Sequence, residues 1–263
     1  MNRKPIKLNI ETYPEAVISY MKDSVLYDSS CSPQAKVVFI DKDDGYFLKE
    51  AAGGTLKTEA LMTGYMHSRN LSEEVLYYGS LHGKDYLLSR KIQGEDCTYR
   101  DYLSEPERLC DTIATLLREL HETDGKDCPV QDRIMTYAET VTCGFDKDSY
   151  EPDLFKEIWK FDSFSDAKRA AEEGLPLLKR EVLLHGDYCL PNIILNHWKF
   201  SGYIDLGCGG IGDRHIDVVW GIWTLNYNLG TVRYTNRFMD AYGRDSIEPE
   251  KLRMIAAMEM IGG

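Results

Sequence analysis

Apolar and polar residues alternate over short distances in the first 90 positions, which is the spacing of β-strands. Short apolar runs are separated by polar turns, as in an antiparallel sheet. The expected strands cover residues 36–40, 46–49, 75–78 and 86–90. The first two are joined by residues 41–45, whose Asp-Gly bend is frequent in hairpins. Residues 11–30 predict only a short helix and a loop.

One predicted helix lies between the two pairs of strands. Glu59 stands at its head, and the side chains of Leu61, Met62, Tyr65 and Met66 recur at helical spacing. This spacing predicts an apolar stripe that an amphipathic helix turns toward the core.

The pattern changes after residue 90. Polar residues and a glycine at 91–94 indicate a hinge, so we place a domain boundary there, between residues 1–90 and 95–263. Ser104–Glu107 has the form of a capping box with proline in the first turn, which predicts the start of a strong helix. The core face of this helix should carry Leu109, Ile113, Leu116, Leu117 and Leu120. Further helices are expected at about 232–242 and 248–261.

Composition and charge narrow the classes of partner. The chain has 263 residues with 31 Lys+Arg and 43 Asp+Glu, a net charge of −12, which argues against a nucleic acid or an anionic membrane as partner. An acidic protein suits a small cationic substrate. The seven cysteines form no C-x-x-C pair, as expected for reduced thiols in the cytoplasm. No signal peptide is visible and no apolar run is long enough to span a membrane.

The chemistry concentrates between Val182 and Gly207. Three apolar runs, at 182–184, 193–195 and 200–204, read as short strands separated by polar turns. Polar side chains follow the first and the third run and precede the second. They are His185, Asp187, Asn192 and Asp205.

The spacing of these residues is that of a phosphoryl-transfer loop. Kinases carry H-R-D-x-x-x-x-N followed by an Asp-x-Gly that binds magnesium. His185-Gly186-Asp187 and Asn192 reproduce this spacing with glycine in place of arginine, and Asp205-Leu206-Gly207 follows. A lone His-Gly-Asp could be an ordinary turn. The whole set in register predicts instead that one aspartate orients a hydroxyl while Asn192 and Asp205 hold metal ions beside a triphosphate.

Lys49 is the candidate for binding phosphates, with Glu59 as its partner. The alternative is a solvated lysine at the end of a strand, which only the later motif disfavours. No G-x-G-x-x-G precedes the hairpin, so we expect the loop of residues 31–36 to approach phosphate through its amides and the Ser32 hydroxyl.

An acidic segment follows at residues 146–166. It has seven acids and three lysines, interleaved with aromatic residues. It reads either as a solvated pair of amphipathic helices or as an acidic, aromatic wall for a polycation. Farther on, Asp213 is expected to cap a helix and Asp217 to brace the catalytic loop through its amides.

These motifs resemble those of the aminoglycoside 3′-phosphotransferases, the kanamycin and neomycin kinases of bacteria. The similarity rests on the stretch from His185 to Ile193, on residues 200–207 and on Asp213–Asp217, and extends more weakly over nearly the whole chain. It implies an α+β, protein-kinase-like, two-lobed fold. The small N-lobe would be an antiparallel sheet, and the larger C-lobe would be mostly helical.

The resemblance also implies residue roles. Asp187 would be catalytic, with His185 and Asp217 supporting its loop, and Asn192 and Asp205 would bind Mg²⁺. Around ATP it implies Lys49 held by Glu59, Phe47 stacked on adenine, and the backbone of Arg90 and Ile92. The drug's ammonium groups would meet Asp153, Glu157 and Glu259.

Two departures from the family bear on the substrate. Cys208 stands where the family usually has arginine, and the C-terminus offers only Glu259 in an apolar tail. We expect an ATP-dependent kinase that phosphorylates the 3′-hydroxyl of aminoglycosides, acting as a monomer or weak dimer. The alternatives are a kinase for a metabolic amino alcohol or sugar, of the choline- or fructosamine-kinase kind, and a non-catalytic module that binds nucleotide. The full set of catalytic residues argues against the last of these.

Overall fold

The computed structural model describes residues 4–262 and divides them into two compact units. The N-terminal unit runs to Gly94 and also contains Ser201–Gly207. The C-terminal unit contains Glu95–Phe200 and the residues from Cys208 onward. The sequence assigned residues 201–207 to the C-terminal lobe, and the structure differs there because Tyr203 packs along the N-terminal unit. Its amide donates to the Leu71 carbonyl at 2.8 Å.

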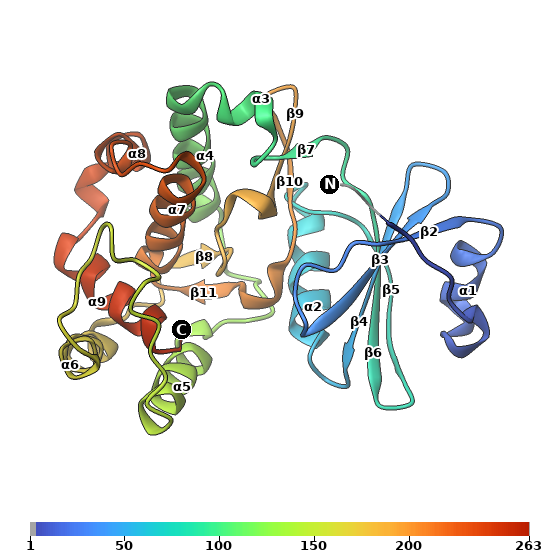
Figure 1. Cartoon of the computed structure of the whole chain (residues 1–263), viewed down its shortest axis with the longest axis horizontal. Coiled ribbons are helices and arrows are strands. Elements are labelled where there is room, and N and C mark those ends of the chain that lie inside the picture. The colour runs from blue at the N-terminus through green and yellow to red at the C-terminus, as the bar shows by residue number, and fades with distance from the viewer. Residues whose placement is uncertain (1–3, 263) are drawn as a thin grey trace. The chain divides into compact units, whose positions relative to one another are not determined.

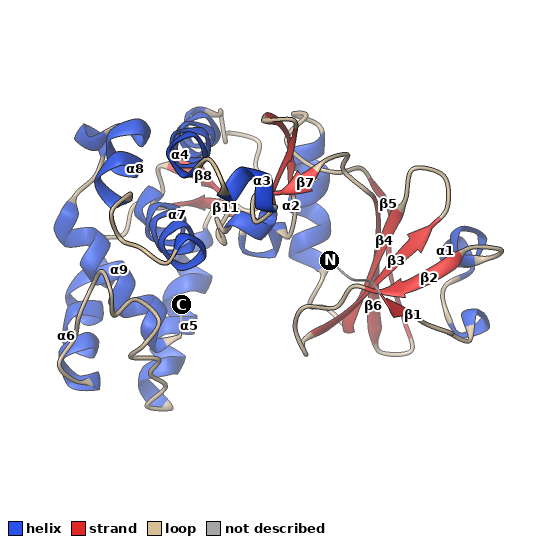
Figure 2. Ribbon diagram, turned by 45° about the horizontal axis from the view of Figure 1, so that its top comes forward, coloured by secondary structure: helices blue, strands red, loops and turns tan. Residues whose placement is uncertain are grey.

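The N-terminal unit is built on an antiparallel sheet with strand order β1-β2-β3-β4-β6-β5, drawn in red in Figure 2. Its strands are β1 (Lys4–Pro5), β2 (Val25–Asp28), β3 (Ala35–Asp41), β4 (Tyr46–Ala52), β5 (Val75–Leu81) and β6 (Lys84–Arg90). Its helices are α1 (Glu15–Met21) and α2 (Lys57–His67), and η1 (Ile10–Thr12) is a single 3-10 turn. The four strands predicted from the sequence are present. The strands β1 and β2 were not predicted.

The two faces of this sheet have different roles. Ile40, Leu48 and Leu88 are fully buried on one face, where Val17 and Met21 of α1 cover them. Side chains alternate along a strand, so the neighbours of Leu48 on β4, which are Phe47 and Lys49, point to the other face. Burial of Leu48 therefore places Lys49 on the face opposite the one that α1 covers.

The helix α2 departs from the predicted stripe at one position. Met62 and Met66 are fully buried, as expected, but Leu61 is 48% exposed. Consecutive residues point about 100° apart on a helix, so a helix that buries Met62 and Met66 together with Glu59 and Thr63 turns Leu61 outward.

The C-terminal unit is mostly helical (Figure 1). Its helices are α3 (Arg100–Leu103), α4 (Pro106–Glu122), α5 (Arg133–Asp146), α6 (Phe164–Gly174), α7 (Arg214–Leu229), α8 (Thr235–Tyr242) and α9 (Pro249–Ile261). Its short strands are β7 (Glu95–Asp96), β8 (Val182–Leu184), β9 (Ile193–Asn196) and β11 (Gly210–Gly212). The strand β10 (Lys199–Tyr203) starts here and ends in the N-terminal unit. The short 3-10 turns are η2 (Leu175–Leu177), η3 (Leu190–Asn192), η4 (Leu206–Cys208) and η5 (Arg244–Ser246).

The core of this unit surrounds β8. This strand is buried along its whole length and pairs with β11, with Leu183 opposite Ile211. Helices α4 and α7 both contact β8. On α4 the predicted core face is largely present, with Leu109, Ile113, Leu117 and Leu120 buried. Among residues 4–262, no helix is long and apolar enough to cross a membrane.

One local prediction is wrong in this unit, and one of the two interpretations of the acidic segment is excluded. The helix α4 starts at Pro106 without the predicted capping box, because the Ser104 hydroxyl donates to the Asp101 carbonyl at the end of α3 instead. The acidic segment is not a pair of helices. Most of it, between α5 and α6, is irregular chain, held where Phe155 is buried against aromatic rings and where Trp223 Nε1 donates to the Leu154 carbonyl at 2.6 Å.

Candidate active site

The predicted catalytic loop begins where the buried strand β8 ends. Asp187 is partly buried there, and Asn192 Nδ2 donates to its carboxylate oxygen Oδ2 at 2.9 Å and to its carbonyl at 3.0 Å. The spacing of five residues between Asp187 and Asn192 allows this contact, because the tight turn brings the Asn192 side-chain amide back to the Asp187 carboxylate. The orientation of the Asp187 carboxylate is fixed by this contact.

Asp217 on α7 binds the backbone of the same loop. Its two carboxylate oxygens accept hydrogen bonds from the backbone amides of His185 and Gly186, both at 2.8 Å. Asp217 is fully buried. Gly186 has φ +85°, and a Cβ at this position would lie 1.9 Å from the carbonyl oxygen of Cys208. The loop therefore has the two amide contacts that bracing requires and no room for a side chain at residue 186.

Two residues that sequence reasoning did not single out extend this contact. His121 on α4 lies 3.1 Å through Nε2 from Asp217 Oδ2 and 2.7 Å through Nδ1 from the Tyr242 hydroxyl on α8. A carboxylate only accepts, so His121 donates to Asp217 from Nε2, while its Nδ1 shares a hydrogen bond with the Tyr242 hydroxyl. In the sequence, the only indication of this role was that His121 lies near the apolar face of the helix predicted from Pro106 onward. Its partners depend on tertiary packing.

In the N-terminal unit, Lys49 lies between two carboxylates. Its Nζ is 2.8 Å from Glu59 Oε2 and 2.9 Å from Asp205 Oδ1. Burial works against the charge of Lys49, but both carboxylates favour it, and the pKa of this ammonium group is raised. Lys49 lies in the middle of β4 rather than at its end, as the sequence had suggested. The Asp205 side chain is 52% exposed, so its carboxylate remains open to solvent.

The other residues predicted to contact the nucleotide also lie in this unit. Phe47 shares the face of the sheet with Lys49 and contacts the ring of Phe39 at 5.2 Å. Ser32 is exposed in the loop between β2 and β3. The backbone amide of Arg90 already donates to the Glu74 carbonyl at 2.9 Å. The Arg90 amide is therefore already paired, and Ile92 follows in the partly buried hinge.

The three acids predicted to contact the acceptor have different surroundings. Asp153 and Glu157 are exposed, and Asp153 pairs with Lys156 at 2.9 Å. Glu259 is 6% exposed on α9 and accepts a hydrogen bond from the Tyr137 hydroxyl at 2.8 Å. Burial raises the pKa of Glu259 to about 7. Glu259 is thus largely buried and paired with Tyr137, and its contact with the drug's ammonium groups stays a prediction.

A pocket of about 430 Å³ adjoins the acidic segment. It is lined by Glu151, Pro152, Asp153, Leu154, Trp223 and Tyr227. The rings of Trp223 and Tyr227 stack at 5.0 Å with 20° between their planes, and Tyr227 is 71% exposed. Carboxylates and an aromatic face thus line one pocket. The sequence indicated its acids, whereas the stacked pair depends on two residues one helical turn apart on α7.

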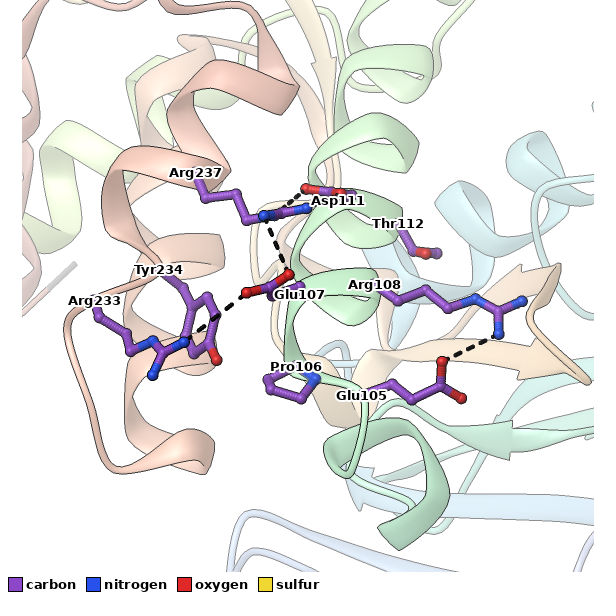
Figure 3. Close-up of a pocket in the computed structure, with 9 residues that line it drawn as sticks. All are labelled: Glu105, Pro106, Glu107, Arg108, Asp111, Thr112, Arg233, Tyr234 and Arg237. Carbon is purple, nitrogen blue, oxygen red and sulfur yellow. Dashed lines mark hydrogen bonds and ion pairs between the residues drawn. The ribbon is translucent and has the colours of Figure 1, made fainter.

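A larger groove of about 650 Å³ lies between α4 and α8 (Figure 3). Its charges are paired with one another. Arg237 binds both carboxylate oxygens of Asp111 at 2.7 Å and approaches Glu107 at 3.6 Å, and Arg108 lies 3.4 Å from Glu105. These ion pairs hold α8 against α4. The groove contains none of the predicted site residues.

One cluster near α7 has the composition of a metal site but not its chemistry. Glu181, Asp213 and His215 offer ligand atoms within 4.8 Å of one another. Both nitrogens of His215 are already used, Nδ1 by Asp213 at 2.6 Å and Nε2 by the amide of Glu248 at 2.9 Å. The ammonium group of Lys251 also lies 3.2 Å from Asp213. The ammonium group of Lys251 thus already neutralises Asp213. Asp213 also caps α7, as the sequence predicted.

Comparisons with known proteins agree with this arrangement. A family model described as a phosphotransferase enzyme family matches residues 34–255. The chain is 46% identical over 261 residues to the "probable aminoglycoside 3′-phosphotransferase" of Lactococcus lactis subsp. lactis (strain IL1403), covering 99% of both chains. It is 28% identical over 199 residues to the aminoglycoside 3′-phosphotransferase of Niallia circulans, covering 76% of each.

Solved structures show the fold. The crystal structure of an aminoglycoside-3′-phosphotransferase of type VIII has a TM-score of 0.75 at 21% identity, covering 90% of this chain and 93% of that one. A thermostable mutant of aminoglycoside phosphotransferase APH(4)-Ia has a TM-score of 0.65 at 15% identity, covering 93% and 89%. The predicted α+β, protein-kinase-like fold is therefore confirmed.

Proposed function

This chain belongs to the phosphotransferase enzyme family, and we propose that it transfers the γ-phosphoryl group of ATP to the 3′-hydroxyl of aminoglycosides such as kanamycin and neomycin. The observation that carries this proposal is the carboxylate of Asp187, fixed by Asn192 on a loop that Asp217 braces. Positioning is the main demand of phosphoryl transfer, because its transition state is loose.

In the proposed reaction, Asp187 accepts a hydrogen bond from the acceptor hydroxyl and orients its oxygen toward the γ-phosphorus. A new bond forms between this oxygen and phosphorus, while the bond from phosphorus to the β–γ bridging oxygen breaks. ADP leaves with that electron pair, and the hydroxyl proton passes to the carboxylate of Asp187. A fixed carboxylate favours this geometry over the many orientations of a free side chain.

Lys49 would bind the phosphates of ATP, with Glu59 holding its ammonium group. Support comes from the two short contacts between these side chains, at 2.8 and 2.9 Å, and from the raised pKa of Lys49, which keeps it charged. The adenine would stack on Phe47 and meet the carbonyl of Arg90 and the backbone of Ile92. Ser32 would lie near the phosphates.

Asn192 and Asp205 are suited to hold Mg²⁺. They supply hard oxygen ligands, and because Asn192 uses its nitrogen to bind Asp187, its amide oxygen remains for a cation. When bound, magnesium would neutralise phosphate charge. These residues would orient it, and Lys49, which also contacts Asp205, would share that neutralisation.

The acceptor would occupy the pocket beside the acidic segment. Glu151 and Asp153 can form charge-assisted hydrogen bonds with ammonium groups, and the exposed ring of Tyr227 offers an apolar face for a sugar. Glu157, which is exposed on the same segment, would add a further negative charge. The net charge of −12 attracts a polycation. We place the reaction in the cytoplasm, where ATP is available.

The test is ADP release in the presence of magnesium with kanamycin, neomycin, the 3′-deoxy drug tobramycin, and choline. We expect turnover with kanamycin and neomycin and none with tobramycin. Asp187→Asn should abolish turnover and leave ATP affinity nearly unchanged, whereas the exposed control Asp240→Asn should behave as the parent enzyme. Turnover of tobramycin at the rate of kanamycin would exclude the 3′-hydroxyl, and turnover of choline alone would move the enzyme to the metabolic kinases.

A further inference from the structure

The buried carboxylate of Asp85 is the centre of a hydrogen-bond cluster in the N-terminal unit. Asp85 lies near the start of β6 and is 0% exposed. Its Oδ2 accepts from the backbone amides of Gly54 at 2.9 Å and Leu56 at 3.1 Å, and from the Tyr78 hydroxyl at 3.2 Å. Its Oδ1 accepts from the Ser80 hydroxyl at 2.6 Å. A buried carboxylate without such donors would be strongly disfavoured.

The two amides belong to the loop that joins β4 to α2. This loop connects the strand that carries Lys49 to the helix that carries Glu59 (Figure 1). Leu56 directly precedes α2 and has no side chain that could cap it. Asp85 supplies a carboxylate at that end of the helix, from a different strand. A negative charge near the first turn also interacts favourably with the helix dipole.

The position of Glu59 depends on this end of the helix. Glu59 is the third residue of α2, so its carboxylate moves with the first turn. Lys49 contacts both oxygens of Glu59, at 2.9 and 2.8 Å. A displacement of about 1 Å is enough to lose such a geometry.

We propose that Asp85 is a positioning residue for ATP binding, which fixes the first turn of α2 so that Glu59 can hold Lys49. This inference rests on the proposed function of Lys49 in binding phosphates. Asp85 acts through the β4–α2 loop, since its carboxylate is fully buried and its bonds go to residues 54, 56, 78 and 80. Its effect is therefore on nucleotide affinity and not on the acceptor.

The chemistry of Asp85 offers graded variants. Burial acts to raise its pKa, but the hydrogen bonds from Ser80, Gly54 and Leu56 outweigh it, so the pKa is lowered and the group stays ionised. Asparagine can keep its carbonyl oxygen toward the two amides and turn its NH₂ toward the Ser80 hydroxyl, which can accept. Alanine removes every acceptor. Ser80→Ala is the matched control, because it removes one bond of the cluster and leaves both loop amides paired.

The experiment is a double-mutant cycle in the full-length enzyme. ATP affinity is measured by direct titration, and KM for ATP and for kanamycin by ADP release, for Asp85→Ala, Asp85→Asn, Ser80→Ala, Glu59→Gln and the double variant Asp85→Ala/Glu59→Gln. We expect Asp85→Ala and Glu59→Gln each to weaken ATP binding about tenfold or more, with KM for kanamycin nearly unchanged. The double variant should be no weaker than Glu59→Gln alone. Asp85→Asn should lose less ATP affinity than Asp85→Ala but more than twofold, because a neutral amide oxygen is a weaker acceptor than a carboxylate. Ser80→Ala should stay close to the parent.

Equal, additive losses in the cycle would overturn the proposal, because Asp85 would then act independently of Glu59. Unchanged ATP affinity in Asp85→Ala would overturn it as well. If Asp85→Ala does not fold, Asp85→Asn with and without Glu59→Gln decides the question. An Asp85→Asn loss above twofold that disappears in the Glu59→Gln background supports the proposal, and anything else overturns it. The ATP titration needs no acceptor, so it tests Asp85 even if kanamycin is not the substrate.

Discussion

We expect Asp217→Asn to destabilise the C-terminal unit by about 1.5–3 kcal/mol and to lower kcat strongly. Asp217 uses different oxygens for the amides of His185 and Gly186, both at 2.8 Å, and it is fully buried. Asparagine keeps one acceptor, so one amide must face an NH₂ group. Losing a hydrogen bond to a charged group costs about 1.5–3 kcal/mol, and leaving a buried N–H unpaired costs about 1–3 kcal/mol. These two costs overlap, and their common range gives the estimate.

The assay combines urea unfolding with amide hydrogen exchange. The change in midpoint reports the loss of stability, and exchange at Gly186 reports whether the loop itself has opened. Asp240→Asn is the matched control, because Asp240 is an exposed acid that pairs with Arg244 on the surface of α8. Exposed ion pairs contribute little, at most about 1 kcal/mol. A stability change below about 0.5 kcal/mol in Asp217→Asn, with unchanged exchange at Gly186, would refute the bracing argument.

Two further predictions concern Lys49 and Glu259. Lys49→Ala should raise KM for ATP at least about tenfold, because Glu59 and Asp205 lose their shared cation, and an unchanged ATP titration would contradict this. Glu259 has its pKa raised to about 7 in the fold, so between about pH 4.5 and pH 7 the unfolded chain loses a proton that the folded chain keeps. Stability should therefore fall as pH rises through this window, by about 3 kcal/mol at most. Urea unfolding at pH 5 and pH 8 should show this fall reduced in Glu259→Gln, and parallel curves would contradict it.

Some of the active site could be predicted because its information is local. Asp187 and Asn192 meet through a tight turn of the chain, so their spacing alone indicates that they can interact. The apolar spacing of residues 46–49 predicted a strand and that of residues 61–66 predicted a helix, so Lys49 and Glu59 could be proposed as a pair. In both cases the residues that matter lie within one turn or in neighbouring elements.

Other features were decided by competition between local patterns and packing. Ser104 has the sequence of a helix cap, yet its hydroxyl closes α3. The acidic segment has helical composition, but burial of Phe155 among the rings of Trp220 and Trp223 holds it as irregular chain. A local propensity is worth about 1 kcal/mol or less per residue, whereas burying a large aromatic ring contributes more.

The sequence, with the family resemblance that its motifs carry, indicated the fold class, four strands of the N-terminal sheet and the turn that joins Asp187 to Asn192. Hydrophobic periodicity indicates which face of an element is buried, and motif spacing indicates which groups one turn brings together. Only the tertiary structure decided the partners of buried polar groups, such as His121 between Asp217 and Tyr242, or Asp85 beneath the loop that leads to Glu59. The physical reason is that a buried donor or acceptor must be paired, and its partner lies on whichever distant element packs against it.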